Sequence, residues 1–236
     1  MKHKKIVLVA MAALLAVAVW GASAFTQGDG SQRALAVDRA TVEKLIASIR
    51  GNTVIVDWHG TWDYSTIQEA LDASSNGDTI IVLPSEGSPD GAYEENVEFP
   101  AKAITLRSIN PDDAETVAAT VIDGRFQGPV VTFAWGATGA AVLDGVTIQR
   151  GSADWGGGIT CDGASPTIRN CVITSNRANW DGAGVYFGWA CAATITDCAI
   201  TGNTAEGYGG GMYCSSDDVP TITGCIFDGN RLSCGV

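Results

Sequence analysis

The stretch Ile168-Arg-Asn-Cys171-Val-Ile173-Thr-Ser-Asn176 decides the fold, because its pattern returns twice at an interval of 27 residues. The two later copies are Ile195-Thr-Asp-Cys198-Ala-Ile200-Thr-Gly-Asn203 and Ile222-Thr-Gly-Cys225-Ile-Phe227-Asp-Gly-Asn230. A Thr precedes each copy. A repeat of this length cannot bury its apolar face alone and stacks on its neighbours, so the period indicates a solenoid.

Glycine clusters lie between the copies and separate two kinds of solenoid. Each cluster leads into a second short alternating strand, and the clusters are Gly156–Gly158, Gly182–Gly184 and Gly209–Gly211. A leucine-rich repeat also uses a similar Ile, Cys and Asn string, but it needs a Leu-bearing segment after the Asn, and Leu is absent from 144 to 231. The sequence therefore favours an all-β parallel β-helix with about 26–27 residues per regular coil and two or three strands in each coil. A looser first copy runs from Leu143 to Gly151.

Two internal ladders follow from stacking the copies in register. Asn176, Asn203 and Asn230 would each bond to the neighbouring coil. Cys171, Cys198 and Cys225 would stack about 4.8 Å apart, which is wider than the ~3.8 Å Cβ separation that a disulfide prefers. We therefore expect these three to be buried thiols.

The other four cysteines are Cys161, Cys191, Cys214 and Cys234. Cys161 and Cys214 hold like positions two coils apart, which is too far to bridge. Cys191 and Cys234 lie outside the repeat, and the sequence leaves the disulfide state of all four open. An odd total of 7 cysteines leaves at least one free thiol.

The N-terminus has the pattern of a secretory signal. Lys2, Lys4 and Lys5 precede an apolar run that ends in Gly21-Ala-Ser-Ala24, so residues 1–24 are predicted to be removed after Ala24. The run is shorter than the roughly 20 residues of a spanning helix, and we expect no membrane span after cleavage, with an uncleaved anchor as the alternative. The mature chain would be secreted or held at the cell surface.

The remaining chain divides into a polar segment with a helix over residues 25–52 and coils over 53–236. The apolar spacing predicts the helix within 34–50, a capping box at Ser65–Gln68 that opens a short helix through Ala73, and strands near 53–56, 79–83, 96–99, 104–107, 120–122 and 130–133. Another glycine cluster would begin near Gly235, so we expect the chain to be a fragment of a longer array, or its end to be covered by a partner.

The charge excludes one class of partner. The formal net charge is −12, and loss of Lys2, Lys4 and Lys5 with the signal takes it to −15. An acidic chain does not bind nucleic acid through bulk electrostatics. The sequence says nothing of the oligomeric state.

The segment Tyr64–Pro84, with Tyr93-Glu-Glu-Asn-Val97, Ala103–Arg107 and Val121–Gly124, resembles the start of secreted right-handed parallel β-helix proteins of the pectate-lyase-like superfamily. That resemblance covers roughly residues 53–230 and implies a short helix that caps the N-terminal end. The pairing of Gly-Gly-Gly with Phe227-Asp-Gly-Asn230 is also similar to repeats of bacterial polymorphic outer-membrane adhesins.

Candidate functional residues lie in the loops before the glycine clusters. These loops place acidic and aromatic side chains together, and stacking would form a column of Asp154, Trp155, Trp180, Asp181, Glu206 and Tyr208. Aromatic faces beside carboxylates suit sugar rings, whose C–H faces are apolar and whose hydroxyls need acceptors. The alternative is that the aromatic rings shield the Gly-rich turns.

The resemblance also brings enzymes into consideration. Lyases of this superfamily bind calcium through outward carboxylates and abstract a proton with an Arg, but no lyase signature surrounds Arg150, Arg169 or the outward Asp residues. We therefore predict a non-catalytic protein of the cell surface or the extracellular space that binds a glycan or a partner surface. The alternatives are a polysaccharide lyase or glycoside hydrolase, and a structural spacer or adhesin stalk. The sequence identifies no catalytic residue, and we expect no cofactor, with calcium as the alternative.

Overall fold

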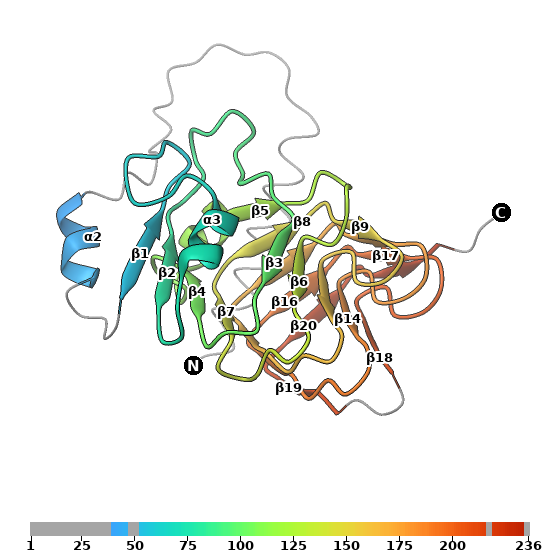
Figure 1. Cartoon of the computed structure of the whole chain (residues 1–236). Coiled ribbons are helices and arrows are strands. Elements are labelled where there is room, and N and C mark those ends of the chain that lie inside the picture. The colour runs from blue at the N-terminus through green and yellow to red at the C-terminus, as the bar shows by residue number, and fades with distance from the viewer. Residues whose placement is uncertain (1–38, 47–51, 216–218, 234–236) are drawn as a thin grey trace, which may run out of the picture.

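The structure is a computed structural model that describes residues 39–46, 52–215 and 219–233. The predicted signal at 1–24 and Cys234 lie outside these residues. The chain forms a parallel β-solenoid with few helices, as predicted, and its coils stack from β1 at one end to β21 at the other (Figure 1).

Four parallel sheets run along the stack. Sheet A is seven-stranded and consists of β1 (Thr53–Val56), β2 (Thr79–Val82), β4 (Thr105–Ser108), β7 (Val142–Asp144), β11 (Thr167–Arg169), β15 (Thr194–Thr196) and β19 (Thr221–Thr223). Sheet B consists of β5 (Val121–Asp123), β8 (Thr147–Gln149), β12 (Val172–Thr174), β16 (Ala199–Thr201) and β20 (Ile226–Asp228). Sheet C consists of β3 (Val97–Phe99), β6 (Val131–Phe133), β10 (Ile159–Cys161), β14 (Val185–Phe187) and β18 (Met212–Cys214). Sheet D has two-residue strands, β9 (Ser152–Ala153), β13 (Arg177–Ala178), β17 (Thr204–Ala205) and β21 (Arg231–Leu232).

Alternation within the short strands fixes which side chains enter the core. In β14, Val185 and Phe187 are buried while Tyr186 between them is half-exposed, because successive side chains of a strand point to opposite faces. One large apolar cluster accordingly runs from the first coils to Ile200. The strand positions expected from the sequence agree with the structure to within a residue or two.

The predicted N-terminal helical cap is α3 (Ile67–Ala73), which buries Ile67, Ala70 and Leu71 in this core. The predicted capping box was wrong by one residue, because Thr66 rather than Ser65 is the N-cap. The carboxylate of Glu95 also accepts hydrogen bonds from the Ile67 and Gln68 N–H groups at 2.8 and 2.9 Å. An acidic group from a later coil therefore helps to satisfy this helix N-terminus.

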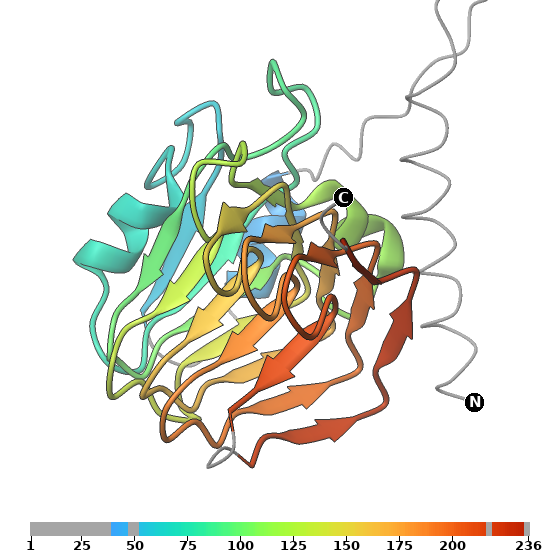
Figure 2. The ribbon, with the colours of Figure 1, turned by 90° about the vertical axis from the view of Figure 1, so that its right-hand side faces the viewer.

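Two further helices cover the outside of the solenoid. α2 (Arg39–Ile46) falls within the helix predicted near residues 34–50, and its Val42 packs on the outer face of the first strands of sheet A. α4 (Ala114–Ala119) was not predicted. It is capped by Asp113, whose carboxylate accepts a hydrogen bond from the Thr116 N–H at 2.9 Å, and its Val117 covers sheet B. Figure 2 shows α3 and α4 on opposite sides of the stack.

The asparagine ladder forms as predicted, and it explains the glycine clusters. Oδ1 of Asn203 accepts from the N–H and Nδ2 of Asn176 at 3.0 Å, and Asn230 repeats both bonds to Asn203. A Cβ at Gly184 would lie 3.0 Å from Asn203 Nδ2, and one at Gly211 would lie 2.9 Å from Asn230 Nδ2. The last glycine of each cluster therefore leaves room for the ladder amide.

The cysteine ladder is also present. Cys171 and Cys198 are buried and Cys225 is half-buried, and the thiol of Cys198 lies 3.8 Å from the carbonyl oxygen of Ile168. The cysteines within the described ranges carry no disulfide. Cys161 and Cys214 both align with Phe187, which places them two coils apart as expected.

Candidate functional site

The loops before the glycine clusters project their aromatic side chains into solvent. The exposed fractions are 47% for Trp155, 57% for Trp180 and 71% for Tyr208. Asp154 and Glu206 are exposed, and Asp181 is half-buried. These positions are accessible to a ligand.

The six residues do not form one continuous column. The Trp180 N–H donates to the Asp154 carbonyl at 2.9 Å, which sets Trp180 beside Trp155 across the coil boundary. In the next coil, however, the Tyr208 N–H donates to Asp181 Oδ1 at 2.6 Å, and Gly207 occupies the place beside Trp180. The expected column is therefore interrupted after Trp180.

The order of residues within the loops explains the interruption. The loops Asn179-Trp180-Asp181 and Glu206-Gly207-Tyr208 have equal length, but the aromatic residue is second in the first loop and third in the second. A Cβ at Gly207 would lie 2.5 Å from Asp181 Oδ1 and 2.7 Å from the Trp180 carbonyl oxygen. Glycine is therefore needed beside Trp180, and Tyr208 lies beside Asp181.

A second aromatic group, which the loop pattern of the sequence does not predict, lies on the outward side of sheet C. Thr160, Tyr186 and Tyr213 are in register on β10, β14 and β18. The Tyr186 and Tyr213 rings stack with centroids 5.7 Å apart and an angle of 4° between their planes. The Trp155 ring lies 6.3 Å from Tyr186. We call Trp155, Tyr186 and Tyr213 the aromatic face.

Two tryptophans lie in the loops that follow strands of sheet C. Trp135 follows β6 and Trp189 follows β14 by two residues each, and they are 68% and 74% exposed. The Trp135 ring packs directly on Gly163, where no Cβ could be accommodated. Sheet C thus carries outward aromatic side chains on β14 and β18 and in the loops before and after its strands, although aromatic residues are ordinarily buried in part or in full.

The charges beside the aromatic face are acidic. A Cβ at Gly188 would lie 2.8 Å from Asp162 Oδ1 and 2.9 Å from Tyr186 Cε1, so this carboxylate borders the Tyr186 ring. Asp154 accepts a hydrogen bond from Asn179 Nδ2 at 2.9 Å beside Trp155. These carboxylates are acceptors that could bind hydroxyl groups laid on the aromatic rings.

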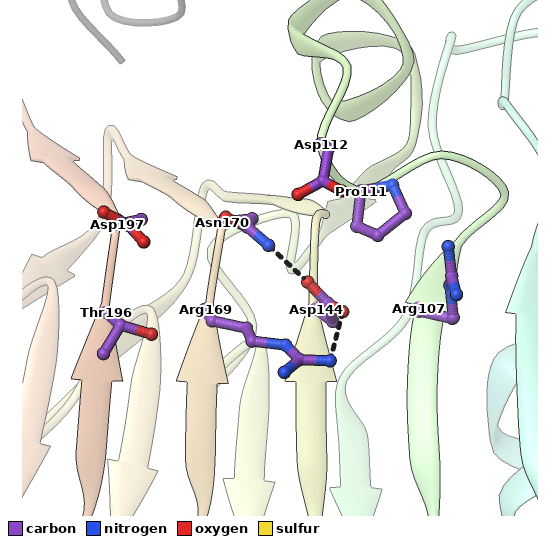
Figure 3. Close-up of a pocket in the computed structure, with 8 residues that line it drawn as sticks. All are labelled: Arg107, Pro111, Asp112, Asp144, Arg169, Asn170, Thr196 and Asp197. Atoms are coloured by element: carbon purple, nitrogen blue, oxygen red, sulfur yellow. Dashed lines mark hydrogen bonds and ion pairs between the residues drawn. The ribbon is translucent and has the colours of Figure 1, made fainter. Parts of the chain in front are cut away.

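A separate polar cleft of about 400 Å³ lies where sheet A turns towards sheet B. Figure 3 shows Arg107, Asp144 and Arg169 side by side on the outward face of β4, β7 and β11. Asp144 is buried, and its two oxygens are engaged by Arg169 Nη2 at 2.9 Å and Asn170 Nδ2 at 2.8 Å. Asp112 and Asp197 line the same cleft.

This cleft clusters charged residues on one sheet face. Its one buried carboxylate, Asp144, is tied into an ion pair rather than directed at open space. The other outward Arg considered above, Arg150, binds Asp123 at 2.6 Å on sheet B, in a separate ion pair. Within residues 39–46, 52–215 and 219–233, no group of three or more His, Cys, Asp or Glu side chains is arranged to hold a metal ion.

Comparison with known proteins supports the fold. The family described as "Right handed beta helix region" matches residues 119–236. No curated protein matches the chain. In the part of the chain that the structure describes, no helix is both long enough and apolar enough to cross a membrane.

Proposed function

Because the chain belongs to the right-handed β-helix family, we propose that it is a secreted or cell-surface protein that binds a glycan on sheet C without cleaving it. The fold is compatible with both pectate-lyase-like and adhesin-like proteins, and one fold hosts many functions. The proposal therefore depends on side chains rather than on the family. Export implies that the mature protein lacks residues 1–24, which its intact mass would reveal.

The stacking of Tyr186 on Tyr213 carries the proposal. Both side chains point away from the core, so burying apolar area on folding does not account for their place. Coils repeat about every 4.8 Å along the stack, so rings at like positions form a continuous apolar strip. Such a strip offers its π-faces to the C–H faces of consecutive sugars, and Asp162 and Asp154 offer acceptors to their hydroxyls.

Binding without cleavage is tested on immobilised polysaccharides. We expect the full chain to be retained by at least one glycan, and Tyr186→Ala with Tyr213→Ala to weaken its affinity at least tenfold. Phe126→Ala is the matched control, because Phe126 is 43% exposed but packs under Arg177 rather than on sheet C. Equal loss in the control, or no loss in the double variant, would reject the face as the binding surface.

The cleft on sheet A supports a second candidate function, cleavage of a polysaccharide. Arg107 and Arg169 flank a buried carboxylate on one open sheet face, the arrangement in which a bound sugar acid would meet cations. The same incubations are therefore assayed for new reducing ends and unsaturated products. Product that disappears in Arg169→Ala would establish this function, whereas retention without product favours the binding protein. If the chain is not retained and no product forms, the structural spacer is favoured.

A further inference from the structure

We propose that the aromatic face selects neutral glycans and disfavours anionic polysaccharides. This inference deepens the proposed function and depends on it. Its basis is the distribution of charge around sheet C, which differs from the distribution around the cleft on sheet A.

No Lys, Arg or His occurs from Ala178 to Asn230, a segment that includes β14, β18 and the loops before and after β14. The same segment contains Asp181 and Glu206, both in the loops that lead to sheet C. The first coils add Glu98, which is exposed in the outward row that continues through Thr132 and Thr160 to Tyr186. A ligand on the aromatic face therefore meets carboxylates on several sides.

Three arginines of the solenoid are engaged away from sheet C. Arg169 binds Asp144 and Arg150 binds Asp123. The Arg177 guanidinium lies over the Phe126 ring at 4.8 Å. Among the described residues, Arg231 lies in the same outward row of sheet D as Arg177, at the last coil, and the charged residues bordering the Tyr186 ring itself are acidic.

A chain of uronic acids or sulfated sugars would bring one negative charge with each charged sugar towards these carboxylates. Like charges a few ångströms apart repel even in water, and the repulsion is screened with a Debye length of about 10 Å at 0.1 M salt. A neutral chain meets no such repulsion, and its hydroxyls donate hydrogen bonds to the same carboxylates. The carboxylates around the aromatic face thus favour the binding of neutral glycans and disfavour the binding of anionic ones.

The test compares polymers that share a backbone and differ in charge. Hydroxyethyl cellulose is paired with carboxymethyl cellulose, methyl-esterified polygalacturonate with polygalacturonate, and glycol chitin with carboxymethyl chitin, each at 20 mM and 300 mM NaCl and with or without calcium. We expect the neutral member of a bound pair to bind at least tenfold more tightly at low salt, with a smaller difference at high salt.

Asp162→Asn locates the effect, because the amide keeps an acceptor and loses the charge beside Tyr186. We expect Asp162→Asn to raise the affinity for the anionic polymer several-fold and to reduce the difference in affinity between the neutral and the anionic polymer of a pair. Asp228→Asn, on the exposed end of sheet B, is the control and should leave that difference unchanged.

The outcomes separate the two claims. Equal or tighter binding of the anionic polymers overturns neutral selection while glycan binding stands. Calcium-dependent binding of those polymers also overturns it, because a bridging cation would then supply the missing charge. Failure to bind either member of every pair rejects the proposed function, and the inference with it.

Discussion

Asn203→Ala should be among the most destabilising single substitutions in the regular coils. Asn203 is fully buried. Its Oδ1 accepts from the Asn176 N–H and Nδ2, and its own Nδ2 donates to the Ile173 carbonyl at 3.0 Å and to Asn230 Oδ1 at 3.0 Å. The variant removes all four bonds and leaves the backbone N–H of Asn176 buried without a partner, whereas the Ile173 carbonyl lies within the paired strands β12 and β16.

The size of the effect follows from that backbone N–H and from the other three hydrogen bonds that the variant loses. A buried polar group that loses its partner costs about 1–3 kcal/mol, and each further hydrogen bond contributes about 0.5–1.5 kcal/mol, so we expect Asn203→Ala to lower the free energy of unfolding by about 3–5 kcal/mol. Asn230→Ala removes the same kind of side chain from a half-exposed rung. Water can replace the lost bonds there, and we expect a loss of about 1 kcal/mol.

Asn203→Asp separates hydrogen bonding from shape. The carboxylate keeps the acceptor but places a second oxygen against the Ile173 carbonyl and Asn230 Oδ1. Burial would raise the pKa of this carboxyl in the folded state, so the stability of the variant should recover as pH falls and be lost as pH rises through that pKa. Only the protonated acid can donate to those oxygens.

The assay is urea unfolding followed by circular dichroism and tryptophan fluorescence together, so that any departure from two-state behaviour is visible. If Asn203→Ala costs less than about 1 kcal/mol, or no more than Asn230→Ala, then the ladder is not a principal source of stability. Unchanged pH dependence in Asn203→Asp would also refute the reasoning.

Three further predictions concern the ends and corners of the solenoid. The hydrogen bond from Cys198 lowers the pKa of the Cys225 thiol to about 7. In a variant whose other exposed cysteines are replaced by serine, iodoacetamide should therefore modify Cys225 with a half-maximal rate near that pH and leave buried Cys198 unmodified. Uniform labelling of both thiols would contradict this. Burial raises the pKa of the Glu95 carboxyl above its ordinary 4.5, so the contribution of Glu95 to stability should fall as pH rises from 4.5 through the raised pKa. Glu95→Gln should therefore make the urea midpoint depend less on pH between pH 4 and 7. Parallel plots of midpoint against pH for the two proteins would contradict this prediction. A Cβ at Gly151 would overlap the Gly157 carbonyl, so Gly151→Ala should lower the free energy of unfolding by about 1–3 kcal/mol, and an unchanged midpoint would show that the coil adjusts freely.

Much of the fold could be predicted because the repeat sets the register. Asn176, Asn203 and Asn230 recur at one interval, so their mutual hydrogen bonds follow once the coils stack in parallel. The contact between the last glycine of each cluster and the ladder amide is harder to predict from the sequence, because it depends on how two distant parts of one coil meet. α4 was missed because its one short buried face, around Val117, has no periodic partner in the sequence.

The candidate site was harder to predict for a physical reason. Alternation directs Tyr186 and Tyr213 outwards, but the recurring acidic and aromatic residues of the loops predict the site there instead. Tyr208 is the third residue of its loop and Trp180 the second, so the two do not meet, and strand periodicity carries no information on such turns. The cleft between Arg107 and Arg169 likewise depends on register between strands separated by an inserted helix.

The most direct test of glycan binding on sheet C is hydroxyl-radical footprinting of the full chain with and without its best-retained polysaccharide. The account predicts reduced oxidation of Trp155, Tyr186 and Tyr213, with no change in the peptide that carries Arg107 and Pro111 at the cleft. Protection at the cleft, with Tyr186 and Tyr213 oxidised as before, would contradict the account and move the binding site to sheet A.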